Sequence, residues 1–317
     1  MAIDGIYLYS LVEDLKKSII NSKIDKINQP EKDEIILTIR KERKNLKLLI
    51  SSSSKYPRIH LTEQSKPNPL QAPMFCMVLR KYLIGGKIID ITQHNGDRIV
   101  KISIEASDEL GFNSIYTLIV EIMGRHSNIT LLRDRDNKIM ECIKHIYPNV
   151  NSYRVLYPGI SYVYPPSSDK INPFTYNSTT LHDFMHKNNI IFDKNLFSSV
   201  FTGISKPLSS TLFQLYNENY AEFTIDNLDN FTNTFIKNLR NELSYTIYED
   251  LEKNYVDFYF MSLMDYEKKY SPLRFEDVNL LMDKYYLEKD KQERIKNRSV
   301  NLNKLINTNI DRCLKKE

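Results

Sequence analysis

The chain has 317 residues, of which 41% are hydrophobic, so it can bury a sizeable core and is long enough for about two domains. Lys and Arg together number 44 and Asp and Glu 40, and a formal net charge of +4 is too small to indicate a nucleic-acid partner, although a phosphate-binding face can be local. Cys76, Cys142 and Cys313 are odd in number and far apart, which excludes a disulfide framework and a Cys-x-x-Cys metal site and favours a reducing, cytoplasmic location.

The N-terminus does not have the composition of a secretion signal, because Asp4 comes early and no apolar block follows a basic start. No apolar run approaches the roughly 20 residues that a membrane-spanning helix needs. The sequence therefore predicts no membrane contact, and no segment explains how the protein would reach a cell surface.

Residues 4–21 are expected to form an amphipathic helix that Asp4 can cap. Strand-like segments follow, and one helix at 72–83, ended by Gly85 and Gly86, interrupts them. The expected strands are 34–40, 45–51, 58–62, 87–93, 98–105, 114–123, 128–134 and 138–146. So many strands with two helices predict an α+β fold for residues 1–172, arranged as a sandwich or a flattened barrel.

A turn between two of these strands contains Asn95 and Gly96, which both tolerate positive φ and predict a tight hairpin. A hairpin tip needs no charged pair, yet Asp97 and Arg98 follow at once. On a strand their side chains would point to opposite faces, which argues against an ion pair between them. We expect one of them to point into a cleft, where it needs a partner. Two edge charges at the start of a strand are the simpler alternative.

The composition changes near residue 148. Residues 147–174 are rich in Pro, Tyr and Ser and have the character of an ordered linker, whose tyrosines either pack onto the first domain or stack on bases. Residues 178–230 are expected to form a helix-hairpin-helix domain, 231–280 a helical middle region, and 281–317 the start of a coiled coil cut within a longer helix. The apolar seam of that coiled coil consists of Ile295, Leu302, Ile306, Ile310 and Cys313.

The stretch Phe201–Ser205 places an apolar residue, a polar residue, Gly and an apolar residue between two short helices, as helix-hairpin-helix motifs do. Gly203 permits the tight turn, and the backbone N–H groups near Ser205 can receive a phosphate. An ordinary connection between helices is the alternative. Further candidate RNA-binding residues are Arg80, Lys81, Arg125 and His126, for which the alternative is a solvated surface charge.

No set of residues has the spacing of a metal or catalytic site. His182 and His186 are four residues apart, but no carboxylate completes a ligand set. The serines at 51–54 lack a Gly-x-Ser-x-Gly setting, and Cys76 reads as a buried thiol. We therefore expect no catalytic residue, no metal and no cofactor.

Several segments together resemble the NFACT family, which includes the RqcH proteins and the fibronectin-binding proteins of Firmicutes. The segments are FCMVLRK, GDR and EIMGRHSN, with the turn TGIS and the final charged helix. The resemblance covers essentially the whole chain. It implies a first domain similar in fold to the N-terminal domain of the formamidopyrimidine-DNA glycosylases. Those enzymes use an N-terminal proline amine and a neighbouring glutamate, whereas this chain starts Met-Ala-Ile-Asp-Gly, so we expect no glycosylase activity.

The resemblance implies a ribosome-associated quality-control factor. Such a protein binds a large ribosomal subunit that carries peptidyl-tRNA, recruits alanyl-tRNA and supports untemplated alanine tailing of the stalled chain. In that family the Asp-Arg pair, here Asp97 and Arg98, engages tRNA, and the segment matching Glu121, Ile122 and Met123 is implicated with it. The rival function is an adhesin that binds fibronectin or fibrinogen, for which the sequence offers neither an export signal nor a wall anchor.

Overall fold

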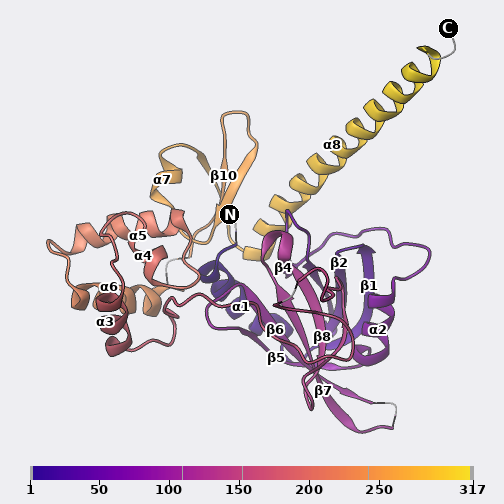
Figure 1. Cartoon of the computed structure of the whole chain (residues 1–317), viewed down its shortest axis with the longest axis horizontal. Helices are drawn as coiled ribbons and strands as arrows, with labels where there is room; N and C mark the ends of the chain where they lie inside the picture. The colour runs from indigo at the N-terminus through magenta and orange to yellow at the C-terminus, as the bar shows by residue number, and fades with distance from the viewer. Residues whose placement is uncertain (1–2, 109, 152, 242, 315–317) are drawn as a thin grey trace.

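The structure is a computed structural model that describes residues 3–108, 110–151, 153–241 and 243–314. It has a mixed α+β fold with a large antiparallel sheet, a group of helices and a second, three-stranded sheet. A long C-terminal helix projects from the rest of the molecule (Figure 1).

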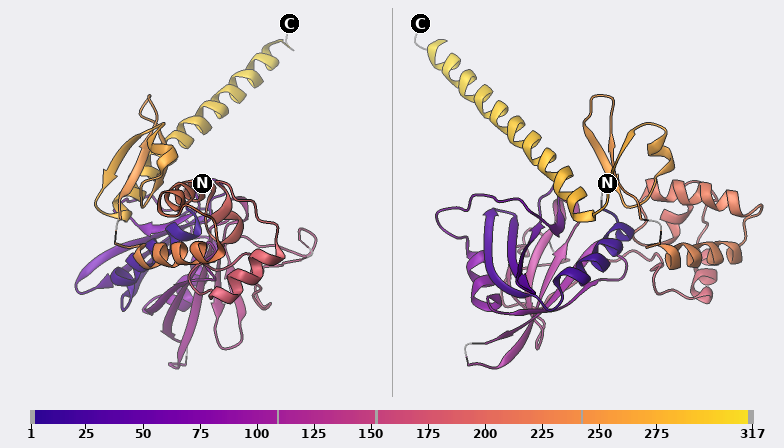
Figure 2. Two further views of the ribbon diagram at one scale, coloured as in Figure 1. Left: turned by 90° about the vertical axis from the view of Figure 1, so that its left-hand side faces the viewer. Right: turned by 180° about the vertical axis from the view of Figure 1, so that it is seen from behind.

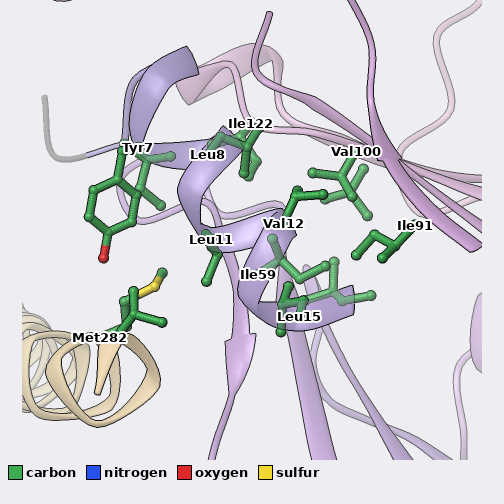
Figure 3. Packing of buried hydrophobic residues seen from close by; sticks show 14 of the residues in the cluster. Tyr7, Leu8, Leu11, Val12, Leu15, Ile59, Ile91, Val100, Ile122 and Met282 are labelled. Atoms are coloured by element: carbon green, nitrogen blue, oxygen red, sulfur yellow. The ribbon is translucent and has the colours of Figure 1, made fainter. Parts of the chain in front are cut away.

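Helix α1, Gly5–Ile19, is the centre of the hydrophobic core. The Asp4 carboxylate accepts the backbone N–H of Tyr7 at 2.8 Å and caps the helix, as predicted. Figure 3 shows the apolar side chains of α1 against those of the large sheet, with Met282 of the C-terminal helix approaching from another side. The labelled residues of α1 in this core are Tyr7, Leu8, Leu11, Val12 and Leu15, all buried.

The large sheet has nine antiparallel strands in the order β4-β3-β2-β1-β5-β6-β7-β8-β9. The strands are β1 Lys23–Glu31, β2 Glu34–Lys41, β3 Lys44–Ser51, β4 Arg58–Leu61, β5 Lys87–Gln93, β6 Ile99–Ser107, β7 Asn113–Glu121, β8 Asn128–Arg133 and β9 Lys138–Cys142. The sequence analysis missed β1. Strands β1 and β5 are paired only at Lys23 and Lys87, so two halves of one sheet meet there. The predicted α+β fold is confirmed, and the strands expected to form a sandwich or a flattened barrel belong to one continuous sheet.

Helix α2, Met74–Leu83, packs against β1 and buries Phe75, Cys76, Leu79 and Leu83. The Tyr-rich linker runs back over the sheet. Leu156 and Tyr162 of the linker are buried in a second apolar cluster that contains Ile119 of β7. Tyr162 therefore packs onto the first domain, as expected of the linker tyrosines.

The helices that follow are α3 Ser178–Lys187, α4 Leu196–Val200, α5 Lys206–Asn219 and α6 Ile225–Asn238. The prediction of a helical middle region at 231–280 is wrong for most of residues 245–275. The chain instead forms β10 Tyr245–Glu249, β11 Tyr255–Tyr259, a short helix α7 Met264–Glu267 and β12 Ser271–Phe275, with the sheet order β11-β10-β12. The physical reason is local, because Tyr, Thr, Ile, Val and Phe in these runs favour strands, and the residues between β10 and β11 form a turn in which Lys253 has a φ of 65°.

The final helix, α8, runs from Val278 to Leu314. Its first turns are buried against both sheets through Val278, Leu281, Met282, Tyr285 and Tyr286. Both views in Figure 2 show the remainder standing clear of the body. Of the helices in the described ranges, none combines the length and the apolar character needed to cross a lipid bilayer.

Polar contacts fix the direction in which α8 leaves. Asp283 accepts from the Nε2 of His60 at 3.1 Å and from the Thr62 hydroxyl at 2.6 Å. Two turns further on, Asp290 faces Arg58 at 3.2 Å and Lys66 at 3.4 Å. The stripe of α8 that meets the large sheet is therefore acidic where the sheet is basic.

Candidate nucleic-acid interface

The turn before β6 has the predicted geometry. Asn95 and Gly96 have φ values of 48° and 69°, and Asp97 donates its backbone N–H to the His94 carbonyl at 2.9 Å. Gly96 is buried, and a Cβ there would lie 2.9 Å from the Asn172 side chain. The turn is thus held against the rest of the molecule and gives Asp97 and Arg98 a fixed position.

Asp97 and Arg98 lie just before β6 rather than on it, and they are beside the end of β7 as expected. Ile99 pairs with Glu121, and Ile122 donates its backbone N–H to the Arg98 carbonyl at 2.9 Å. Asp97 Oδ1 accepts the backbone N–H of Arg98 at 2.7 Å, so this carboxylate oxygen orders the turn.

Arg98 lines an open pocket of about 270 Å³. Five other parts of the chain contribute residues to it: Ile3 before α1, Lys55, Tyr56 and Pro57 before β4, Ile122 and Gly124 after β7, Val256 and Asp257 of β11, and Tyr285 and Tyr286 of α8. The expectation that Arg98 opens onto a hollow rather than a sealed core is confirmed.

Sequence reasoning missed most of this pocket, because the misassigned residues 255–259 and the base of α8 supply one wall. The Tyr-Tyr pair of α8 was a signal, since adjacent tyrosines at a helix start need buried surface. The Tyr56 and Tyr286 rings lie 6.2 Å apart edge to face, and burial raises the pKa of Tyr286, so its hydroxyl stays neutral. A guanidinium and a lysine beside aromatic rings suit a ligand with phosphates and flat bases.

Glu121 does not face this pocket. Its side chain is buried and bonded to Arg154, whose Nη1 donates to Oε2 at 3.0 Å and whose Nη2 donates to Oε1, and it accepts from the Tyr162 hydroxyl at 2.5 Å. Its expected exposure to RNA is therefore wrong for the conformation described, because both carboxylate oxygens serve to anchor the linker.

Ile122 and Met123 point to different sides of the sheet. Ile122 is 2% exposed and belongs to the main core around α1, while its edge contributes to the pocket of Arg98. Met123 packs at the border of the second cluster with Ile99 and Tyr162. Of the three residues at the end of β7, Ile122 alone lines the pocket.

The other basic candidates divide into two groups. Arg125 and His126 are exposed and directly follow Gly124, so they flank the pocket of Arg98. Arg80 donates to the Ile27 carbonyl at 2.8 Å, and Lys81 lines a different hollow. Arg80 and Lys81 are exposed, which agrees with the alternative of a surface charge, and they do not join the Arg98 site.

Gly203 and Ser205 lie at the turn between α4 and α5, where Gly203 has a φ of 80° and Ile204 is buried, as expected. The expectation that this turn faces solvent or RNA is wrong. Gly203 accepts the backbone N–H of Gly5 at 2.8 Å, and the Ser205 N–H donates to Asp4 at 3.2 Å. A carboxylate of the same chain therefore occupies the position expected for a phosphate.

Asp226 lies 2.9 Å from Nε2 of His182, and among the described residues no carboxylate joins His182 and His186 in one ligand group. A different group with ligand-type atoms close together consists of Glu141, Cys142 and His145. Burial raises the pKa of the Cys142 thiol to about 12, and the thiol donates to the Leu156 carbonyl at 3.3 Å. This thiol is a hydrogen-bond donor of the core and is poorly suited to bind a metal.

Comparison with known sequences shows to which family the chain belongs. The description of the family that matches residues 4–317 is NFACT N-terminal and middle domains. The chain belongs to the NFACT family. Among curated NFACT relatives, the Rqc2 homolog RqcH of Streptococcus pneumoniae is 35% identical over 303 residues, which are 95% of this chain and 51% of that protein. The protein of the same name from Bacillus subtilis is 44% identical over 173 residues, or 55% of this chain and 30% of that protein.

Among solved NFACT structures, the N-terminal part of the fibronectin/fibrinogen-binding protein from Streptococcus suis is similar, with a TM-score of 0.75 and 34% identity. The match covers 90% of this chain and 98% of that one. The present chain spans about half the length of the first curated relatives it matches.

Proposed function

We propose that this NFACT chain is the RNA-binding part of a ribosome-associated quality-control factor that works in the cytoplasm. The complete protein binds the large ribosomal subunit obstructed by peptidyl-tRNA and recruits alanyl-tRNA, which supports untemplated alanine tailing of the stalled nascent chain. The names of the curated relatives support the general role.

The observation that carries the proposal is the placement of Arg98. Its position in a pocket with Lys55, Tyr56 and Ile122 brings two cations, an aromatic ring and an apolar contact to one hollow. The Asp257 carboxylate also lines this hollow, and Lys55 forms an ion pair with Glu293 at 2.5 Å. An unstacked RNA base offers edges to a guanidinium and a flat face to such side chains, and its phosphates attract lysine. Asp97 is beside Arg98 and adds an acceptor for an exocyclic amine.

The proposal assigns this chain no catalytic residue, because peptide-bond formation is the ribosome's own chemistry. Met1 and Ala2, on which the expected lack of glycosylase chemistry rests, lie outside the described residues. We also propose that α8 forms one helix of a coiled coil, since Ile295, Leu302, Ile306 and Ile310 are exposed along it.

The test compares the affinity of Arg98→Ala and Asp97→Ala for alanine tRNA with that of the parent. Loss of a good charged contact to a base costs about 1–3 kcal/mol, so Arg98→Ala should weaken binding roughly tenfold to a hundredfold. Asp97→Ala should blunt discrimination among tRNAs more than it weakens overall binding, because it removes a negative charge from an RNA-facing site.

The matched control is Arg135→Ala, which removes an exposed arginine from the turn between β8 and β9. Melting temperatures show whether each variant is folded. If Arg98→Ala lowers the melting temperature strongly and leaves the affinity per folded molecule unchanged, Arg98 is a structural residue and the proposal fails.

A second candidate is binding to fibronectin or fibrinogen, which the name of the similar Streptococcus suis structure suggests. Recovery of the full-length protein from cells distinguishes the two. Enrichment of alanine tRNA and large-subunit RNA supports the first candidate, and protein ligands without RNA support the second.

A further inference from the structure

Three cations lie side by side on adjacent strands where the two halves of the large sheet meet. Lys23 of β1 is paired directly with Arg40 of β2 on one side and with Lys87 of β5 on the other. Residues directly opposite each other in an antiparallel sheet point to the same face, and neighbouring strands are about 4.8 Å apart. All three side chains are exposed, so they form a row of positive charge across three strands.

Intramolecular ion pairs leave most of this charge unneutralised. Arg40 Nε lies 3.7 Å from Asp25, whereas Lys23 and Lys87 form no ion pair within the described ranges. Like charges directly opposite one another destabilise a sheet. The three cations therefore destabilise the pairing of β1 with β5 at Lys23 and Lys87. Packing within the sheet does not explain why cations occupy these positions.

The neighbouring hairpin between β2 and β3 also carries a cation at a position where it costs stability. Glu42 and Arg43 have φ values of 49° and 67°, the left-handed region in which Asn and Gly are favoured. The turn at Asn95 and Gly96 uses the favoured residues for the same conformation. At the β2–β3 tip an arginine stands where glycine would cost less, and it lines an open hollow of about 580 Å³ with Asp25, Arg40 and Asn45.

Lys41 follows Arg40, so its side chain points to the other face of the sheet, where its Nζ donates to the Lys17 carbonyl of α1 at 2.8 Å. Its direct partner Lys44 shares that other face. We call the basic surface the set of exposed cations formed by Lys23, Arg40, Arg43 and Lys87. The carboxylates beside them are fewer, namely Asp25 of β1, Glu42 of the β2–β3 turn and Glu105 of β6, which is paired with Lys87.

We propose that the basic surface binds the phosphodiester backbone of RNA at a second site, distinct from the pocket of Arg98. The proposal rests on the proposed function in that RNA is the partner. A row of cations without aromatic or apolar members suits a backbone of repeated phosphates and reads no base. The Arg98 pocket and the basic surface lie at opposite ends of α1, whose 15 residues are about 22 Å long at 1.5 Å per residue. One RNA molecule can contact both.

The test neutralises the row in the complete 317-residue chain as Lys23→Gln/Arg40→Gln/Lys87→Gln. The control, Lys187→Gln/Lys194→Gln/Lys237→Gln, removes three exposed lysines near or on α3 and α6. Affinities for an alanine tRNA transcript and for a loop-free RNA duplex are measured over a range of salt concentrations. The row variant should bind both RNAs about tenfold or more weakly, and its slope of log K against log salt should be smaller by about 2 to 3, since each phosphate contact contributes about 0.7–0.9. The control should retain the parental slope.

Two readouts separate binding from folding. The row variant should melt at the parental temperature or above, because the repulsion between the strands is removed. Arg43→Gly, which also removes the left-handed arginine, should melt at a higher temperature and bind RNA more weakly.

The outcomes separate this inference from the function. If the row variant keeps the parental slope while Arg98→Ala loses tRNA affinity, the basic surface is not an RNA site and the function stands. If the row variant weakens binding and Arg98→Ala does not, the second site stands and the role of Arg98 fails. If the parent binds neither RNA, both are wrong. Binding of poly-glutamate through the same cations, with RNA binding unaltered, assigns the surface to an acidic protein and overturns the proposal.

Discussion

Gly5 donates its backbone N–H to the carbonyl of Gly203 at 2.8 Å, which joins the start of α1 to the turn between α4 and α5. The turn before Asp97 meets the same point, since the Gln93 side chain donates to the Gly5 carbonyl at 2.8 Å. Three backbone segments far apart in sequence therefore meet at Gly5. This contact places the Arg98 turn relative to the helices.

The first prediction concerns Gly5→Ala. A Cβ at Gly5 would lie 2.2 Å from the Gly96 carbonyl oxygen and 2.6 Å from the Gly203 Cα, so backbone must move. We expect a loss in the free energy of unfolding of about 3 kcal/mol or more, measured by denaturant unfolding.

Gly159→Ala is the control for a glycine that no other segment approaches. Gly159 has a φ of 91°, but a Cβ there would meet no heavy atom within 4 Å apart from its chain neighbours. The substitution should cost about 1–2 kcal/mol, the ordinary penalty of a left-handed alanine. Equal losses for the two variants would mean that the close backbone approach at Gly5 is not a constraint in solution.

The second prediction concerns pH and His60. Burial lowers the pKa of His60, with Arg58 adding to the effect, although the hydrogen bond to Asp283 opposes it. Burial acts to raise the pKa of Asp283, but hydrogen bonds from His60, Thr62 and the Glu63 backbone outweigh it and lower that pKa. A neutral imidazole thus donates from Nε2 to an ionised carboxylate.

The direction in which stability changes with pH depends on whether the folded or the unfolded state binds the proton more readily. Below about pH 6.5 the unfolded chain protonates this histidine, whereas folded His60 resists protonation until a lower pH. The unfolded state is then favoured, so the melting temperature should fall as the pH falls from about 7 toward 5. His60→Gln keeps an N–H donor and removes this titration, so its melting temperature should depend less on pH in that range. Parallel curves for parent and variant would contradict the prediction.

Local patterns were sufficient for much of the fold. Alternating apolar residues located most strands of the large sheet, the Asn95–Gly96 pair located its turn, and Asp4 located the start of α1. The neighbourhood of Arg98 and Ile122 also followed, because consecutive antiparallel strands bring the start of β6 to the end of β7.

The rest depends on long-range contacts. Tyr285 and Tyr286 reach Arg98 only because α8 docks on both sheets, and no periodicity encodes that docking. Asp4 fills the helix start expected to hold a phosphate, although about 200 residues separate it from Ser205. From its sequence, Glu121 is expected to be exposed at the end of a strand. It is buried because Arg154 and Tyr162, which lie in a segment without strands, bind its carboxylate.

The last prediction concerns the buried pair of Glu121 and Arg154, whose side chains are 1% and 8% exposed. Removing one member leaves the other charge buried without a partner, which costs about 3–5 kcal/mol. Glu121→Gln should therefore lower the melting temperature strongly, and so should Arg154→Met. The double variant Glu121→Gln/Arg154→Met should lose less stability than the sum of the single variants, since no buried charge remains.

The same variants decide what Glu121 does for RNA. If it acts by anchoring the linker, Glu121→Gln and Arg154→Met should alter tRNA affinity to the same extent, because either breaks the same anchor and neither side chain lines the pocket of Arg98. Affinity is measured below the melting transition, so that only folded molecules are compared. A loss of tRNA affinity for Glu121→Gln with none for Arg154→Met would show that the carboxylate itself contacts RNA, which requires Glu121 to leave Arg154 and Tyr162 in the complex.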